Sequence, residues 1–159
     1  MTPIGSTGEP RRAGSGREAL AGRAVSEQAA PAAPPGGVRG IDHVQLAAPQ
    51  GCEAAARRFY GGVLGLREIP KPEALRRRGG VWFQAGCAQL HIGVEEPFRA
   101  ARRAHPALRV EPAGLDALAA ALAVAGAPVT WDDDLPGTRR FYCEDPWGNR
   151  LELLSEAWE

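Results

Sequence analysis

The feature of this sequence that most constrains its fold is an internal repeat. His43-Val44-Gln45-Leu46 falls on His105-Pro106-Ala107-Leu108, 62 residues later. Further along, Gln89-Leu90-His91-Ile92 falls on Arg150-Leu151-Glu152-Leu153, with an offset of 61 residues. Because self-similarity at a constant spacing is the signature of a duplicated structural unit, the sequence predicts two similar modules in place of one unrepeated fold.

Hydrophobic periodicity predicts the same element order in both copies: one strand, one helix and three short strands. In the first copy we expect these elements at residues 41–47, 52–64, 66–69, 80–85 and 88–94. In the second copy we expect them at 105–111, 115–125, 128–131, 139–143 and 149–154. The predicted fold class is therefore α+β, with two β-α-β-β-β modules at about 40–95 and 104–156.

The N-terminal segment differs from the rest of the chain. Residues 1–39 hold few branched apolar residues among many Gly, Pro, Ser and Ala. A segment of this composition cannot bury enough apolar surface to offset the conformational entropy lost on ordering. We therefore predict a disordered tail over 1–39, with a brief helical stretch around 18–28, and one domain over 40–159.

Four polar residues occupy equivalent positions in the two copies. They are His43, His91, His105 and Glu152. Side chains alternate between the faces of a strand, and aliphatic residues occupy the opposite face at all four positions. If the aliphatic faces pack under the helices, the four polar side chains point into the concavity of the sheets, where three imidazoles and a carboxylate suit a divalent transition metal. Three further residues on the predicted inward face are candidate substrate contacts: Gln45, Gln89 and Arg109.

Composition and charge argue against several classes of partner. The 19 basic residues balance the 19 acidic ones, so no net field attracts the protein to nucleic acid or an anionic membrane. No apolar run approaches the roughly 20 residues of a membrane span, and we find no secretory signal pattern. The three widely spaced cysteines, Cys52, Cys87 and Cys143, do not suggest a disulfide framework. We expect a cytoplasmic protein that binds a small molecule.

Three segments carry a resemblance to a known family: Ile41-Asp42-His43-Val44, the helical piece Arg58-Phe59-Tyr60 with Val63-Leu64-Gly65-Leu66, and the run from Glu144 through Asp145-Pro146-Trp147-Gly148-Asn149 to Glu152. With them, residues from about 40 to 156 resemble the vicinal oxygen chelate superfamily. This superfamily includes glyoxalase I, extradiol dioxygenases, fosfomycin resistance proteins and bleomycin resistance proteins. The resemblance implies paired β-α-β-β-β modules that form a cupped mixed sheet, in agreement with the repeat.

The resemblance also implies a ligand set. In metal-dependent members the ligands come from the first and last strands of each module, which here gives His43, His105 and Glu152, with His91 at the more variable fourth position. The expected cofactor is a divalent cation: Zn, Ni, Co, Mn or Fe. His91 stands where glyoxalase I enzymes often have Glu, and it could instead hydrogen-bond the substrate or a metal-bound water. Similarity to glyoxalase I implies that Glu152 could leave the metal and act as the catalytic base.

Two classes of function remain open from the sequence. In the first, a metalloenzyme binds two substrate oxygens; four protein ligands would suit glyoxalase-like isomerase or lyase chemistry, and three would suit an Fe(II) extradiol-type dioxygenase. In the second, a metal-free cup binds a drug, as in bleomycin resistance proteins. We also expect a homodimer, because pairing covers exposed sheet edges. In that arrangement His43 and His91 come from one subunit, and His105 and Glu152 from the other.

Overall fold

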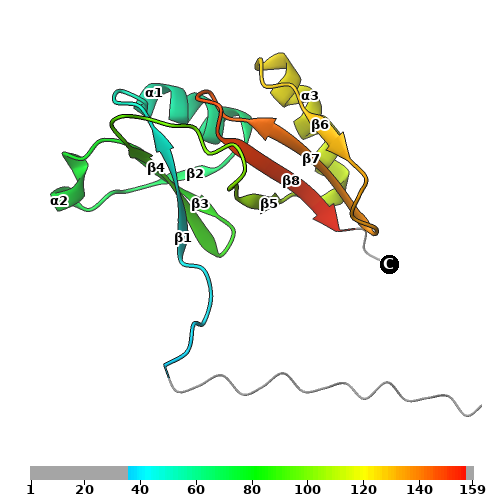
Figure 1. The fold of residues 1–159 in the computed structure, drawn as a ribbon, viewed down its shortest axis with the longest axis horizontal. Helices are drawn as coiled ribbons and strands as arrows, with labels where there is room; N and C mark the ends of the chain where they lie inside the picture. The colour runs from blue at the N-terminus through cyan, green and yellow to red at the C-terminus, as the bar shows by residue number, and fades with distance from the viewer. Residues whose placement is uncertain (1–35, 157–159) are drawn as a thin grey trace, which may run out of the picture. The chain divides into compact units, whose positions relative to one another are not determined.

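The structure is a computed structural model that describes residues 36–156. Backbone contacts divide the chain into two units, Met1–Val38 and Arg39–Glu159. Nearly all of the tail predicted over 1–39, including its helical stretch around 18–28, lies outside the described residues. The second unit contains every described strand and helix, and its ribbon is drawn in Figure 1.

Two four-stranded mixed sheets form the framework of this unit (Figure 1). The first sheet has the order β1-β4-β3-β2, with β1 His43–Ala48, β4 Ala88–Val94, β3 Val81–Ala85 and β2 Arg67–Ile69. The second has the order β5-β8-β7-β6, with β5 Ala107–Arg109, β8 Arg150–Glu156, β7 Thr138–Glu144 and β6 Thr130–Asp132. In each sheet the first and last strands of the module pair in parallel and the other pairs are antiparallel. The α+β class and the repeated module are confirmed.

One longer helical segment accompanies each sheet. In the first module α1, Glu53–Ala56, continues directly into a π-helical turn, η1, Arg57–Val63. The Leu64 amide donates to the Phe59 carbonyl at 3.0 Å, a π-type bond, and Gly65 ends the segment at φ +70°. In the second module a 3₁₀ turn, η2 Pro112–Gly114, leads into α3, Leu115–Val124.

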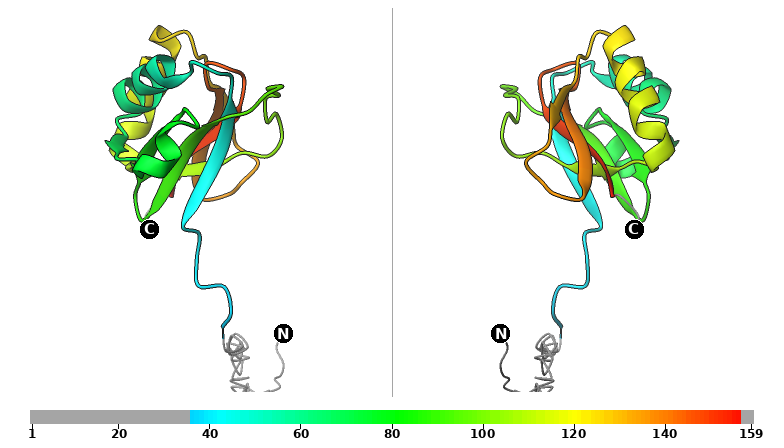
Figure 2. Two further views of the ribbon diagram at one scale, coloured as in Figure 1. Left: turned by 90° about the vertical axis from the view of Figure 1, so that its left-hand side faces the viewer. Right: turned by 90° about the vertical axis from the view of Figure 1, so that its right-hand side faces the viewer.

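The aliphatic strand faces and the helices form the hydrophobic core. Figure 2 shows α1, η1 and α3 on one side of the sheets. The buried side chains that form the core with them include Phe83 and Ile92 in the first module and Phe141 and Leu153 in the second. The predicted face parity is therefore correct: alternate residues point toward the helices, and the histidine-bearing face points away. No helix within residues 36–156 has the length and apolar character needed to cross a bilayer.

The two modules are joined by a buried polar cluster, which we call the Asp145 cluster. Tyr60 of η1 donates its hydroxyl to Asp145 Oδ2 at 2.8 Å. Asn149 donates its side-chain amide to Asp145 Oδ2 at 2.7 Å and to the Ala47 carbonyl of β1 at 2.8 Å. Its amide oxygen accepts from the Ala101 backbone at 2.9 Å. These bonds tie the turn between β7 and β8 to elements of the first module.

Most predicted bounds differ from the observed ones by one or two residues, and three differences are larger or of another kind. The strand predicted over 105–111 is only β5, because Pro106 has no N–H to donate to a ladder and Pro112 starts the 3₁₀ turn. The strand predicted over 128–131 starts at Thr130, after Pro128, for the same reason. A four-residue helix, α2 Glu73–Arg76, lies in a segment for which no element was predicted.

Candidate functional site

The first half of the candidate site lies on the polar face of the first sheet. His43 and Gln45 share this face of β1, and the parallel register places Gln45 beside His91 of β4. On the other side of β4, Trp82 of β3 pairs with His91. Three neighbouring strands therefore present an imidazole or indole ring on one surface.

The ring of His91 lies between two other rings. Its centroid is 4.3 Å from that of His43 and 3.9 Å from that of Trp82, and both pairs are stacked. His91 is only 5% exposed, and its Nε2 lies 2.9 Å from Gln89 Oε1. Burial, together with the neighbouring His43, lowers the pKa of His91 and so favours its neutral form.

The tautomer of His43 is set by a carboxylate. His43 Nδ1 donates to Asp42 Oδ1 at 2.7 Å, although both side chains are largely exposed. With the proton held on Nδ1, the lone pair of the ring is on Nε2. A histidine oriented by a carboxylate in this way resembles the ligating histidines of metal sites.

The second half of the candidate site lies on the second sheet. His105 directly precedes Pro106, and its Nε2 lies 3.1 Å from Glu152 Oε2 on β8. His105 Nδ1 donates to the Arg103 carbonyl at 2.6 Å. A neutral imidazole with this tautomer has its lone pair on Nε2, facing the lone pairs of a carboxylate oxygen. Two such atoms attract one another only through a proton or a cation between them.

An arginine contacts the other oxygen of Glu152. Arg140 Nη1 donates to Glu152 Oε1 at 3.1 Å, while its Nη2 donates to Asp132 Oδ1 at 2.7 Å. The hydrogen bond from Arg140 lowers the pKa of Asp132. Glu152 is therefore held between His105 and Arg140, with one carboxylate oxygen directed to each.

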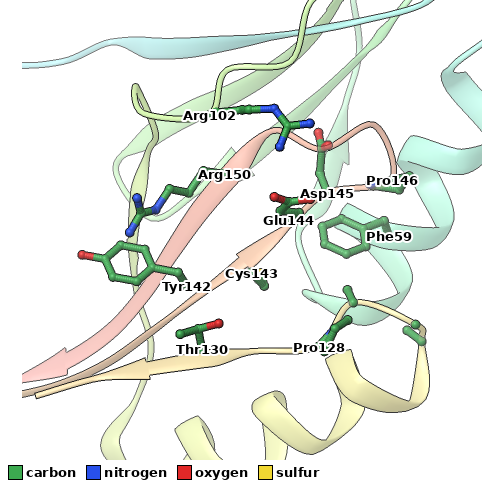
Figure 3. Close-up of a pocket in the computed structure, with 13 residues that line it drawn as sticks. Phe59, Arg102, Pro128, Thr130, Tyr142, Cys143, Glu144, Asp145, Pro146 and Arg150 are labelled. Atoms are coloured by element: carbon green, nitrogen blue, oxygen red, sulfur yellow. The ribbon is translucent and has the colours of Figure 1, made fainter.

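A cavity of about 630 Å³ lies at one end of β7 and β8 (Figure 3). Tyr142, Glu144 and Arg150 line it, together with Phe59 of η1. The Arg150 guanidinium carbon lies 3.7 Å from the centre of the Tyr142 ring, a cation–π contact that is visible in the figure. None of the four predicted metal ligands lines this cavity.

The predicted site residues are brought together in pairs. His43 stacks on His91, and His105 meets Glu152, but within residues 36–156 no three His, Cys, Asp or Glu side chains gather closely enough to hold a metal ion. The three predicted substrate contacts are distributed over both sheets: Gln45 lies over Gly93, Gln89 contacts His91, and Arg109 is exposed on β5.

Comparison with known proteins identifies the family. Residues 50–154, about two thirds of the chain, match the family model described as a glyoxalase-like domain. The chain belongs to this glyoxalase-like family. A search of functionally curated proteins returns no significant match to the sequence.

Solved structures place the glyoxalase-like chain in the vicinal oxygen chelate superfamily, as the sequence predicted. A glyoxalase family protein from Bacillus anthracis is 50% identical, with a TM-score of 0.71 over 75% of this chain and 96% of that one. A lactoylglutathione lyase from Agrobacterium tumefaciens shares the fold at 22% identity, with a TM-score of 0.57 over 74% and 94% of the two chains.

One neighbour of the glyoxalase-like chain contains a metal. A mutant of the fosfomycin resistance protein FosX from Listeria monocytogenes, complexed with Mn(II) and 1S,2S-dihydroxypropylphosphonic acid, shares the fold at 16% identity. Its TM-score is 0.62, over 75% of this chain and 93% of that one. That neighbour thus holds a divalent metal together with a small phosphonate.

The donor atoms of the glyoxalase-like chain fit a divalent cation. His43 and His105 each keep Nδ1 bound to an oxygen, which leaves Nε2 as the donor, and Glu152 Oε2 faces His105 Nε2. Nitrogen and carboxylate donors of this kind suit Zn, Ni, Co, Mn and Fe. His91 fits less well, since its Nε2 is engaged by Gln89 and its ring is stacked.

Two site residues were not found from the sequence. Trp82 lies between the buried Val81 and Phe83, and Arg140 directly precedes the buried Phe141, so strand parity places both on the polar face with His91 and Glu152. The face of the strand on which each residue lies could have been predicted for both. The strand register, which places Trp82 opposite His91 and brings Arg140 within reach of Glu152, could not be predicted from the sequence.

Proposed function

We propose that the protein is a divalent-metal-dependent enzyme that acts on a small, oxygen-chelating substrate with glyoxalase-like isomerase or lyase chemistry. The observation that carries this proposal is the contact between His105 Nε2 and Glu152 Oε2 at 3.1 Å, with the Nδ1 proton of His105 committed to Arg103. This arrangement supports a cation between the two side chains. The same metal would take His43 as a third ligand and His91 as the fourth.

The proposed metal site is completed in a homodimer. His43 and His91 belong to one half-site, and His105 and Glu152 to another, and each half-site is built within one module. We propose that the half-sites of two subunits face one another, so that each dimer has two sites. A cytoplasmic location is part of the same proposal, since the substrate would be a small metabolite.

The residues around the proposed site have separate tasks. A bound divalent cation would act as a Lewis acid toward two neighbouring oxygens of the substrate. His43 and His105 would hold the cation through Nε2, and Arg140 would fix the carboxylate plane of Glu152 through Oε1. Glu152 would leave the metal during the reaction, and its Oε2 would then take a proton from the carbon next to the chelating oxygens.

A second candidate function follows from the position of His91. Its Nε2 is bound to Gln89 Oε1 and its ring lies between His43 and Trp82, an arrangement that favours contact with substrate over metal ligation. His43, His105 and Glu152 would then form a set of two histidines and one carboxylate with three open positions. Such a set suits an Fe(II) extradiol-type dioxygenase.

Metal content separates both metalloenzyme proposals from a metal-free drug-binding protein of the bleomycin resistance type. Protein grown with Zn, Ni, Co, Mn and Fe available should purify with about one metal per site, and removal of the metal should lower the melting temperature. A protein that stays free of metal and is not stabilised by any of these ions would favour the binding function. In that case a proton, and not a cation, joins His105 to Glu152.

Mixed dimers test the assembly. A chain with His43→Ala and a chain with Glu152→Ala should each bind metal poorly, whereas a hybrid of the two has one site with neither substitution and should regain about half of the wild-type metal. The matched control is a hybrid of two differently tagged His43→Ala chains, which should regain none. Verified hybrids without metal would point to a site within one chain.

A further inference from the structure

A second, smaller cavity lies on the same sheet face as His43 and His91. Its volume is about 230 Å³. Gln45 of β1, Trp82 of β3 and Gly93 of β4 line it, and the segment around α2 contributes Lys71 and Arg78. This cavity is distinct from the 630 Å³ cavity in Figure 3, which is lined mainly by residues of the second module.

The strand register places this cavity next to the first half-site. Gln45 is two residues beyond His43 on β1, and Gly93 is two residues beyond His91 on the parallel strand β4. Two residues advance a strand by about 6.6 Å. Gln45 and Gly93 therefore lie roughly 7 Å further along their strands than His43 and His91. The cavity adjoins the histidine pair, because the Trp82 ring that stacks on His91 forms part of its wall.

A glycine makes room for the polar lining. A Cβ atom built on Gly93 would lie 2.7 Å from Gln45 Nε2, which is closer than any real contact of this kind. The absence of a side chain at Gly93 thus allows the Gln45 amide to lie across β4. Gln45 presents two amide donors and a carbonyl at the surface of the cavity.

The charge of the cavity is positive. Lys71 and Arg78 line it and no carboxylate does. The Lys71 ammonium donates to the Gly79 carbonyl and lies 5.8 Å from the centre of the Trp82 ring, which leaves further ammonium protons for a ligand. Within residues 36–156, neither Lys71 nor Arg78 forms an ion pair.

Carboxylates near the α2 segment are already engaged. Glu53 accepts the Gly80 amide at 2.8 Å, and Glu68 pairs with Arg57 at 2.9 Å. They line a neighbouring cavity that also contains Lys71, but not the one beside the histidines. Glu53 and Lys71 attract one another electrostatically, but no carboxylate lines the cavity beside the histidines. Two cations, an amide and an aromatic wall are the groups that recognise a small oxyanion.

We propose that this cavity binds an oxyanion, a carboxylate or phosphate group, through Lys71, Arg78 and Gln45. This inference rests on the proposed function in one respect: the metal site fixes where the reacting end of the substrate binds. It then defines the substrate class: a small molecule with two neighbouring oxygens at the histidine pair and an anionic group further along β1 and β4. Trp82 lies between the two ends and contacts the carbon chain that connects them.

The first test uses metal-free protein, so that no metal competes for the anion. Inorganic phosphate is titrated while the amide resonances of Gly79 and Gly93 and the Trp82 indole resonance are followed. We expect saturable shifts at these positions, and binding at least about tenfold weaker in Arg78→Met and in Lys71→Met. Lys71→Arg keeps the charge and should retain binding even if Lys71→Met is unstable.

Arg77 provides the matched control, because it neighbours Arg78 and does not line the cavity. Arg77→Gln removes one positive charge from the same segment and should leave phosphate affinity unchanged. Wild-type protein without any shift at the cavity would overturn the proposal. So would an affinity that falls equally in Arg77→Gln and Arg78→Met, since only the net charge would then matter.

The second test distinguishes a substrate group from a free anion. In Co(II)-loaded protein, glutaric monohydroxamate offers two chelating oxygens and a carboxylate on a three-methylene chain, whereas acetohydroxamate offers the oxygens alone. We expect the carboxylate to improve binding about tenfold or more in wild type and in Arg77→Gln, and to give no advantage in Arg78→Met.

The two hydroxamates also separate failure of this inference from failure of the proposed function. If both change the Co(II) spectrum with equal affinity, the metal site stands and the oxyanion subsite is refuted. If phosphate binds at the cavity and neither hydroxamate affects a Co(II) spectrum, the oxyanion site stands and the metalloenzyme proposal is refuted. Phosphate then binds as a free anion, and the substrate class is withdrawn.

Discussion

Removal of one hydroxyl from the Asp145 cluster should measurably destabilise the fold. Tyr60 is fully buried, and its hydroxyl donates to Asp145 Oδ2 at 2.8 Å across the boundary between the modules. Tyr60→Phe deletes this donor and preserves the ring that packs on Phe83. The change therefore tests the hydrogen bond with little effect on core volume.

The magnitude follows from what remains around the carboxylate. Asp145 keeps three donors, the Trp147 amide and the backbone and side-chain amides of Asn149, at 2.9, 2.8 and 2.7 Å. Loss of one hydrogen bond to a charged group costs about 1.5–3 kcal/mol. For a domain of this size, the melting temperature should fall by roughly 5–15 °C.

Urea and thermal unfolding of Tyr60→Phe, followed by far-ultraviolet circular dichroism, provide the assay. The control is Tyr142→Phe, because Tyr142 is partly buried and its hydroxyl makes no hydrogen bond within residues 36–156. We expect the control to change the free energy of unfolding by less than about 0.5 kcal/mol. If Tyr60→Phe behaves like the control, the hydrogen bond is not what joins the modules, and our account of the Asp145 cluster is wrong.

Three further predictions concern the site and the pH dependence of stability. Glu152→Gln should weaken Co(II) binding at least 10–100-fold, since it removes the charge and keeps the shape; an unchanged affinity would remove Glu152 from the ligand set. If three ligands hold the metal, His91→Ala should leave the Co(II) affinity near that of wild type. If His91 is a fourth ligand, the same substitution should lower the Co(II) affinity and change the d–d spectrum. The Gly80 amide lowers the pKa of Glu53, so its stabilising effect is present above about pH 4.5 and lost as pH falls through the lowered pKa. Glu53→Gln should thus be less stable at pH 7 and lose less stability between about pH 5 and pH 3; parallel curves for the two proteins would contradict this.

Much of the fold was predictable because the pattern of apolar residues is local and strong. The strand predicted over 88–94 has the observed bounds of β4, and its alternation of Leu90 and Ile92 with His91 assigned the faces correctly. The helix predicted over 52–64 corresponds to α1 and η1, although consecutive glycines, Gly61 and Gly62, weaken the α-helical pattern and the segment ends in a π turn.

The site was predictable within each module but not between modules. The repeat and the strand parity predicted that four polar side chains share one concavity. The structure brings them together as two pairs, His43 with His91 and His105 with Glu152. Whether the two pairs meet depends on how one sheet faces another, which no local pattern encodes. The short helix α2 was missed for a related reason: Leu75 is its only large apolar residue, too little for a periodic signal.

The position of Lys71 has a practical consequence. It is the only lysine among 159 residues, and it is half-buried with its ammonium group bonded to the Gly79 carbonyl. An amine-reactive reagent can therefore modify the chain only at this side chain and at the α-amino group. The rate of labelling at Lys71, read by peptide mass, reports on whether the two cavities that this side chain lines are filled, without a substituted residue or an added dye.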